Sequence, residues 1–311
     1  MTMSSASVTT KGQAPVGAPK ERAEVVENKI TFGHWFRDKG WRHVVGVLVT
    51  IYALVPILYI ISASLNKNGT LTGSNELFRT ISFYNFQELS NTKFWTWVLN
   101  SVVISGITAI GTVLMAAAAA YAFSRFRFTG RRLGLTSLLI IQMFPQMLAF
   151  VAIFLLLMNL GDVVPILGLN SKFAVIAVYL GGALGMNTFL LYGFFNTIPK
   201  ELDEAAEIDG LTHGQIYWQI ILRLAAPIIS VVALLSFIGT FSDFVLAKVI
   251  LTSEENWTVA VGLYSWVASQ LDANWGQFAA GAIIASVPIL VLFLFLQKYI
   301  VGGLTAGAVK G

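Results

Sequence analysis

The sequence predicts an all-α, polytopic membrane protein with six transmembrane helices, from its hydropathy, its low charge and the length of its apolar stretches. The mean hydropathy of the 311 residues is +0.73, and only 12% of them are charged, too few to cover a water-soluble domain. Crossing a bilayer takes about 20 apolar residues. The stretches that qualify are residues 44–65, 97–122, 133–158, 173–195, 224–251 and 277–300.

Several classes of function are excluded by what the sequence lacks. Without cysteine, the chain has no disulfides, thiolate metal sites or cysteine nucleophiles. There is no G-x-x-x-x-G-K-[ST] loop for ATP phosphates, no H-E-x-x-H metal motif and no G-x-S-x-G hydrolase elbow. We therefore expect a non-enzymatic chain that itself binds neither a cofactor nor a metal.

The distribution of basic residues predicts the orientation of the chain. Residues 1–41 are polar and read as a disordered tail, so residues 42–311 form the membrane domain. Arginine and lysine concentrate in this tail and in the loop 124–132, SRFRFTGRR, whereas the segment 252–276 has none. Because such residues favour the cytoplasmic side, both termini and the segment 196–223 are predicted to be cytoplasmic. The net charge of +4 follows this pattern and does not indicate nucleic-acid binding.

Four spans contain residues that break or bend helices. Pro56, Pro145 and Pro288 lie inside the first, third and sixth spans, and Pro227 and Gly239 lie inside the fifth. Neighbouring helices can satisfy the backbone groups that such breaks release, so we expect bends at these positions.

Few polar side chains fall inside the spans, and each has two readings. A charge at the bilayer centre costs about 2.5–3.5 kcal/mol, so Asp243 lines a substrate pathway or forms a structural pair with Lys248 or a partner subunit. Gln142, Gln146 and Asn187 could bind sugar hydroxyls, although amides more commonly join helices. These four residues, Asp243 and the three amides, are the candidates for a substrate pathway.

The stretch ELDEAAEIDGLTHGQIYWQII, residues 201–221, is unusually acidic for its surroundings. Its carboxylates suit the positive end of a helix that starts after Pro199. Gly210 suits a left-handed helix end, and Thr212 with Gln215 forms a capping-box pattern that opens a second helix. The sequence predicts two helices joined by a glycine turn.

The first of these helices carries a small apolar stripe of Leu202, Ala205, Ala206 and Ile208, with the acids mostly outside it. The spacing alone is typical of a solvated amphipathic connector. The small-residue stripe stands against that reading, because small residues ringed by charge suit docking into a groove of another protein. The pattern alone does not decide between these readings.

The same stretch resembles the EAA loop of ABC importer permeases of the carbohydrate type. Glu204-Ala205-Ala206, then Gly210, then Ile220-x-Leu222 match its pattern, and Arg223 stands where the family has proline. We therefore expect the bend into the fifth span at Pro227. WTVAVGLYSW and the stretch from Trp275 to Gly311 resemble the membrane subunits of maltose/maltodextrin importers. The resemblance covers residues 42–311.

The resemblance implies the transmembrane domain of a type I ABC importer whose 201–210 helix docks on a separate ATPase. Glu204 would bind a basic group of that ATPase, Ala205 and Ala206 would allow close approach, and Gly210 would form the turn. Asp209, Ile220 and Leu222 complete the implied coupling set. The carboxyl-terminal residues 302–311 resemble the family's cytoplasmic terminus.

The implied partners are a second homologous permease (MalF-like), a cytoplasmic ATPase dimer that holds ATP and Mg²⁺, an extracytoplasmic sugar-binding protein and membrane lipid. The implied cargo is an oligosaccharide of the maltose or maltodextrin type. The alternative is a self-contained secondary transporter or channel in which the acidic loop is regulatory.

Overall fold

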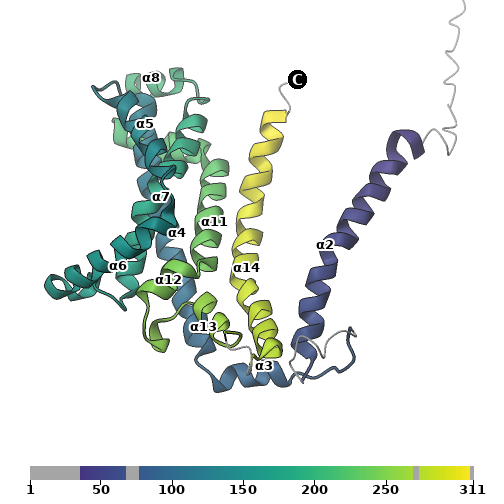
Figure 1. Cartoon of the computed structure of the whole chain (residues 1–311). Helices are drawn as coiled ribbons and strands as arrows, with labels where there is room; N and C mark the ends of the chain where they lie inside the picture. The colour runs from purple at the N-terminus through teal and green to yellow at the C-terminus, as the bar shows by residue number, and fades with distance from the viewer. Residues whose placement is uncertain (1–35, 68–76, 269–272, 309–311) are drawn as a thin grey trace, which may run out of the picture. The chain divides into compact units, whose positions relative to one another are not determined.

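The computed structural model describes residues 36–67, 77–268 and 273–308, and every helix or strand element in these ranges is a helix (Figure 1). The elements are η1 (Phe36–Gly40), α2 (Trp41–Leu65), α3 (Tyr84–Glu88), η3 (Leu89–Asn91), α4 (Phe94–Arg125), α5 (Arg131–Gln142), α6 (Gln146–Val163), η4 (Pro165–Leu167), α7 (Lys172–Phe195), α8 (Glu201–Ile208), α9 (His213–Ile216), η5 (Tyr217–Ile221), α10 (Leu222–Leu224), α11 (Ala226–Ser242), α12 (Val245–Ile250), η6 (Glu254–Asn256), α13 (Val259–Ser265) and α14 (Trp275–Ala308). The predicted disordered tail lies outside the described residues up to residue 35.

Two compact units divide the chain, residues 1–54 and 55–311, and the side-chain contacts described below lie in the second. The all-α prediction is confirmed. Helices α2, α4, α7 and α14 are each long and apolar enough to cross a membrane. Two further candidates are bent helix pairs, so the chain has up to six spans in its described part.

Breaks are found at two of the four prolines inside the predicted spans, Pro145 and Pro227, whereas Pro56 and Pro288 lie inside the continuous helices α2 and α14. Helices α5 and α6 meet at 98°, and Pro145 is extended at the start of α6. The helical segment 213–224 meets α11 at 79°, and Pro227 lies in the first turn of α11, where its missing N–H breaks no hydrogen bond. The bend into the fifth span therefore lies where Pro227 predicted it.

The break expected at Gly239 is not found, because this residue lies inside the continuous helix α11. The helix ends instead at Asp243. The Asp243 carboxylate accepts hydrogen bonds from the amides of Leu246 and Ala247, at 3.0 and 3.3 Å, and so starts the separate helix α12. The predicted span 224–251 consequently consists of two helices.

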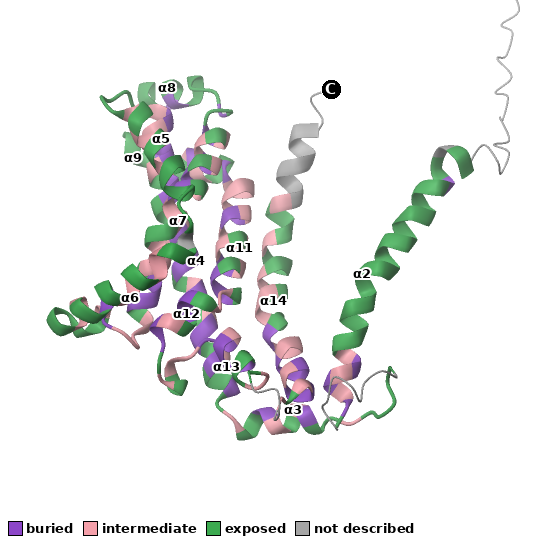
Figure 2. Cartoon of the chain, viewed as in Figure 1, coloured by how far each residue is buried: buried purple, intermediate pink, exposed green. Residues whose placement is uncertain are grey.

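Helix α4 packs against both α7 and α11, and many of its residues are buried (Figure 2). Ala109, Ala116, Ala117 and Ala120 are buried on it. Because lipid provides no hydrophobic force between helices, small residues that allow backbones to approach closely stabilise such contacts. The alanines of the run 115–123 therefore allow α4 to pack closely against its neighbours.

At the end of the bundle opposite α8, the segment after α12 is fixed to α4 (Figure 1). The Trp97 indole donates a hydrogen bond to the Glu254 carbonyl at 2.9 Å, and the Asn100 amide donates to the carbonyls of Glu255 and Trp257. Trp257 and Trp266 pack around the buried Trp97 ring. These tryptophans therefore contribute to the core of the bundle.

Asn170 joins this segment to the start of α7. Its side-chain oxygen accepts hydrogen bonds from the Thr252 amide at 3.2 Å, the Ser253 amide at 2.9 Å and the Ser253 hydroxyl at 2.9 Å. Its own backbone is left-handed, with φ 62°, a conformation that asparagine tolerates better than most residues. One side chain thus fixes the turn after α12.

We expect Asn170→Ala to destabilise the protein by about 1–3 kcal/mol, because it removes three hydrogen bonds to Thr252 and Ser253 that each contribute about 0.5–1.5 kcal/mol. The measurement is thermal unfolding of the purified protein. Asn159→Ala is the control: Asn159 is exposed and bonds only the Leu155 carbonyl of its own helix, so the change should be within about 0.5 kcal/mol. Equal effects of the two substitutions would contradict the role of Asn170.

Candidate functional site

The acidic stretch forms the predicted pair of helices. Helix α8 ends at a turn in which Gly210 has φ +85°. The Leu211 amide donates back to the Ala206 carbonyl and the Gly210 amide to the Glu207 carbonyl, both at 3.0 Å, which is the Schellman arrangement. The left-handed helix end predicted at Gly210 is confirmed.

The second helix begins at the predicted capping box. The Gln215 amide donates to the Thr212 hydroxyl at 3.4 Å, and the Thr212 amide donates to the Gln215 side chain at 2.8 Å. Across the turn, His213 Nδ1 lies 3.2 Å from a Glu207 carboxylate oxygen. Residues 201–224, hereafter the hairpin, are thus fixed by local contacts that the sequence specifies.

Two residues of α8 face the bundle. Asp203 is 8% exposed and Ala206 is 6% exposed. Ala206 packs in the core cluster that contains Leu191 and Phe195 of α7 and Ile216 of α9. Asp203 lies 2.5 Å from Nε of Arg125, at the end of α4. This inward face fixes α8 to the membrane helices.

Arg125 serves two elements at once. Besides its ion pair with Asp203, it donates from Nη1 to the Phe195 carbonyl and from Nη2 to the Ile198 carbonyl, both at 3.2 Å. These carbonyls belong to the end of α7 and the turn after it, where a cation is favoured. Burial raises the pKa of the Asp203 carboxyl, and the Arg125 guanidinium opposes that shift. One side chain therefore joins α4, α7 and α8.

A second anchor comes from Tyr121 of α4. Its hydroxyl donates to the His213 carbonyl at 3.3 Å, and its ring centroid lies 5.1 Å from that of Tyr217. Ile216 and Ile221 of the hairpin are fully buried beneath these contacts. The hairpin and the membrane helices thus share one core.

The predicted coupling residues separate into two groups. Glu204, Ala205, Asp209 and Gly210 are exposed, whereas Ala206 is buried and Ile220 and Leu222 are half-buried against the core. Of the predicted apolar stripe, Leu202, Ala205 and Ile208 are exposed, and Ile208 is 87% exposed. We call Leu202, Glu204, Ala205 and Ile208 the outer face of α8. Ala206 belongs to the opposite, inward face, because it packs in the core.

Three of the predicted pathway residues bond within the bundle. The Gln142 amide donates to the Gly182 carbonyl of α7 at 3.0 Å, and the Asn187 amide donates to the Ala183 carbonyl of its own helix at 2.8 Å. Asp243 accepts a hydrogen bond from the Tyr179 hydroxyl at 2.8 Å. The Gln146 side chain lies outside the described residues. A place for these residues on a substrate pathway stays a prediction.

Lys248, the proposed ion-pair partner of Asp243, points elsewhere. Its Nζ lies 4.7 Å from the centroid of the Trp257 ring. Asp243 bonds instead to Tyr179 and to the first amides of α12. The carboxylate therefore has a structural role that sequence reasoning did not identify.

Long apolar helices, two sharply bent helix pairs and a hairpin packed on their ends are the features of a polytopic helical transport protein. Residues 112–305 match the family described as "Binding-protein-dependent transport system inner membrane component", and the chain belongs to this family. The predicted resemblance to ABC importer permeases is thereby confirmed.

Known relatives extend over most of the chain. It is 40% identical over 267 residues to the galactooligosaccharides transport system permease protein GanQ of Bacillus subtilis. This alignment covers 85% of this chain and 92% of GanQ. It is 38% identical over 282 residues to the maltose/maltodextrin permease protein MalG of Salmonella typhimurium, covering 86% and 94%. A bacterial ABC transporter that imports alginate is similar in structure, with a TM-score of 0.67 and 26% identity over 85% of this chain and 97% of that chain.

Proposed function

We propose that this chain is a membrane-spanning subunit of an ATP-driven oligosaccharide importer, and that its hairpin docks on a separate ATPase. The observation that carries the proposal is that one face of α8 is buried against the bundle and the other is exposed. Its inward face is held by Arg125 and the shared core, whereas its outer face, with Glu204 and Ala205, is exposed. A helix that only connected two spans would not need a buried ion pair.

The bonds of the hairpin supply a path for transmitting movement. A push on α8 acts on α4 and α7 through Arg125, and on α4 again through Tyr121. The hairpin also runs directly into α11 across the 79° bend. Closure of a partner ATPase would therefore move three packed helices together and switch the bundle between its inward-open and outward-open states.

The proposed assembly follows the family. A second, MalF-like permease would complete the pathway, an ATPase dimer would hold ATP and Mg²⁺, and an extracytoplasmic binding protein would deliver the sugar. The hairpin and both termini would be cytoplasmic, and the end of the bundle with α3 and α13 would face the binding protein. This chain would bind no cofactor and catalyse no reaction.

The proposed cargo is an oligosaccharide, since the similar proteins are named for galactooligosaccharides, maltodextrin and maltose. We propose a maltose or maltodextrin type of cargo. Competition of unlabelled galactooligosaccharide and maltodextrin against labelled maltose uptake tests this choice. Stronger competition by the galactooligosaccharide would contradict it.

The docking role is tested by Glu204→Lys and Ala205→Trp in the reconstituted transporter. Because both residues are exposed, the fold should persist, while reversed charge or added bulk blocks the partner surface. We expect sugar uptake and binding-protein-stimulated ATP hydrolysis to fall at least about tenfold, which is about 1.4 kcal/mol.

Asp162→Lys is the matched control, since it reverses an exposed carboxylate at the end of α6. We expect it to leave uptake within about twofold. Wild-type uptake in both hairpin variants would overturn the docking role. Sugar uptake by the purified chain alone, without ATP or partners, would instead support the self-contained transporter.

A further inference from the structure

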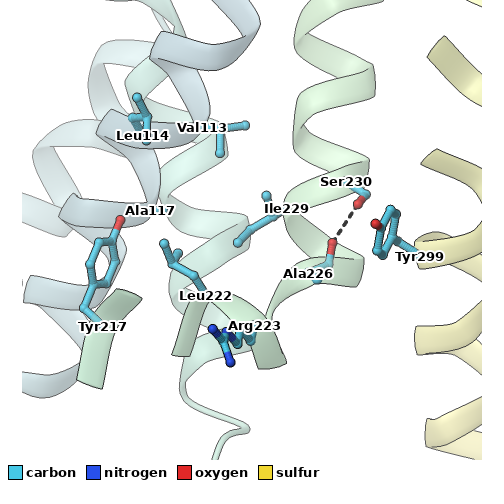
Figure 3. A pocket seen from close by; sticks show the side chains of 10 residues that line it. All are labelled: Val113, Leu114, Ala117, Tyr217, Leu222, Arg223, Ala226, Ile229, Ser230 and Tyr299. Carbon is cyan, nitrogen blue, oxygen red and sulfur yellow. Dashed lines mark hydrogen bonds between the residues drawn. The ribbon is translucent and has the colours of Figure 1, made fainter. Parts of the chain in front are cut away.

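A cavity of about 380 Å³ lies at the joint between the hairpin and the membrane helices (Figure 3). It is bounded by α4, the η5–α10 segment, α11 and α14. Val113, Leu114, Leu222 and Ile229 are among its apolar walls, and Arg223 and Tyr299 contribute polar groups. The volume falls in the range of about 300–1,000 Å³ that small-molecule sites occupy.

Arg223 is the charged residue of this cavity. It is exposed, and within the described part of the chain it has neither a hydrogen bond nor an ion pair. The other arginine of the same region, Arg125, is buried and fully engaged. Arg223 is thus a cation at an apolar cavity whose charge no residue in the described part of the chain neutralises.

The position of the cavity along the helices corresponds to the interface between the membrane and water. Its wall residues Val113 and Ala117 precede Arg125, the last residue of α4, by two to three turns, or roughly 12–18 Å. Arg223 lies on α10, directly before the bend into the membrane. The cavity therefore runs from a charged level at the helix ends into the apolar part of the bundle.

Aromatic and basic side chains on α14 extend the polar rim. Tyr299 faces Ser230 across the cavity (Figure 3). Lys298 Nζ lies 5.0 Å from the centroid of the Tyr299 ring. Both residues lie at the end of the apolar span 275–300, and tyrosine and lysine at such a position are typical of the level at which lipid headgroups lie.

We propose that this cavity binds one anionic phospholipid from the leaflet on the hairpin side, with an acyl chain against the apolar walls and the phosphate at Arg223. The charged end of the cavity suits the phosphate of such a lipid, and its apolar walls suit an acyl chain. Basic pockets between transmembrane helices bind anionic headgroups on the cytoplasmic side of other membrane proteins. Free phosphate would leave the apolar walls unfilled, and a purely apolar ligand would leave Arg223 unpaired.

The test is binding of phosphatidylglycerol to the complete purified transporter, measured by native mass spectrometry during lipid titration. Arg223→Ala should weaken the tightest site about fivefold, the effect of one basic residue at an anionic surface. Arg223→Lys should stay within about twofold of wild type, because it keeps the charge. Ala226→Phe should also weaken binding, because it fills the cavity and leaves Arg223 intact.

Arg132→Ala is the matched control, since Arg132 is an exposed arginine of α5 that does not line the cavity. Phosphatidylcholine with the same acyl chains should bind at least about fivefold more weakly, and excess inorganic phosphate should not displace the lipid. Equal binding of both lipids, displacement by phosphate, or unchanged binding in Arg223→Ala would overturn the proposal.

A protein occupant is tested separately. Because the chain has no cysteine, Ser230→Cys places a single thiol of this chain in the cavity. A cross-link from that thiol to a neighbouring subunit of the assembled transporter would show that protein fills the site, and would overturn the lipid proposal. Labelling by a lipid-soluble maleimide without such a cross-link supports it.

Discussion

Replacing Asp203 by leucine is expected to destabilise the transporter by about 3–5 kcal/mol and to abolish coupled ATP hydrolysis, because it leaves a buried cation without its partner. The side chain of Arg125 is only 6% exposed, and Asp203 is the acidic group in contact with it. The measurement is thermal unfolding of the purified complex together with stimulated ATPase activity.

The opposite substitution, Arg125→Met, should be at least as harmful. It leaves the Asp203 carboxylate buried, and it also removes the donors to the carbonyls of Phe195 and Ile198. In the double variant Arg125→Met/Asp203→Leu, no charge remains buried, so most of the ion-pair penalty should disappear. The loss that remains measures the two carbonyl bonds.

A charge swap distinguishes these contributions. Arg125→Asp with Asp203→Arg restores opposite charges, yet it places a carboxylate beside carbonyl oxygens at the end of α7. Because that helix end favours a cation, the swap should not recover stability. Full recovery would contradict the role assigned to the carbonyl bonds.

Glu207→Leu is the control on the same helix. Glu207 pairs with His213 in an exposed position, where an ion pair contributes about 0–1 kcal/mol. If Asp203→Leu is no more harmful than Glu207→Leu, the buried pair does not anchor the hairpin.

Features of the hairpin that depend on neighbouring residues could be predicted from the sequence. The left-handed end at Gly210, the capping box of Thr212 and Gln215, and the bend at Pro227 each follow from local backbone chemistry. The apolar spans follow from their length and composition in the same way.

Features that depend on distant partners could not be predicted. Asp203 looks like any other acid of α8, and its inward direction is decided by Arg125, which lies on a different helix. Its position three residues before the buried Ala206, one turn away on the same face, was the available signal. Asn170 likewise acquires its role only when the segment after α12 folds back onto it.

The fifth span breaks at Asp243 and not at Gly239, where the sequence predicted a break. Glycine is common in membrane helices, so Gly239 does not end α11. Asp243 ends it because a carboxylate can accept hydrogen bonds from free amides of a new helix.

Gly262→Ala is expected to destabilise the protein, because the added methyl group would enter a packed aromatic cluster. A Cβ on Gly262 of α13 would lie 2.0 Å from a carbon of the Trp97 ring. The ring cannot easily move, because its indole is hydrogen-bonded to the Glu254 carbonyl and Trp257 and Trp266 pack against it. Forcing extra volume into a packed core costs about 1–3 kcal/mol, and a 2.0 Å approach to a fixed ring belongs at the upper end of that range. This cost is larger than the roughly 1 kcal/mol that alanine gains over glycine in a helix.

The matched control is Gly239→Ala in α11, where the added Cβ has no neighbouring atom within 4 Å. Helix propensity then acts alone, so this variant should unfold at the same or a higher temperature than wild type. We expect opposite signs for the two alanine substitutions in thermal unfolding of the purified protein. If Gly262→Ala were also neutral, the Trp97 cluster would be loosely packed, and the segment after α12 would not be rigidly fixed to α4.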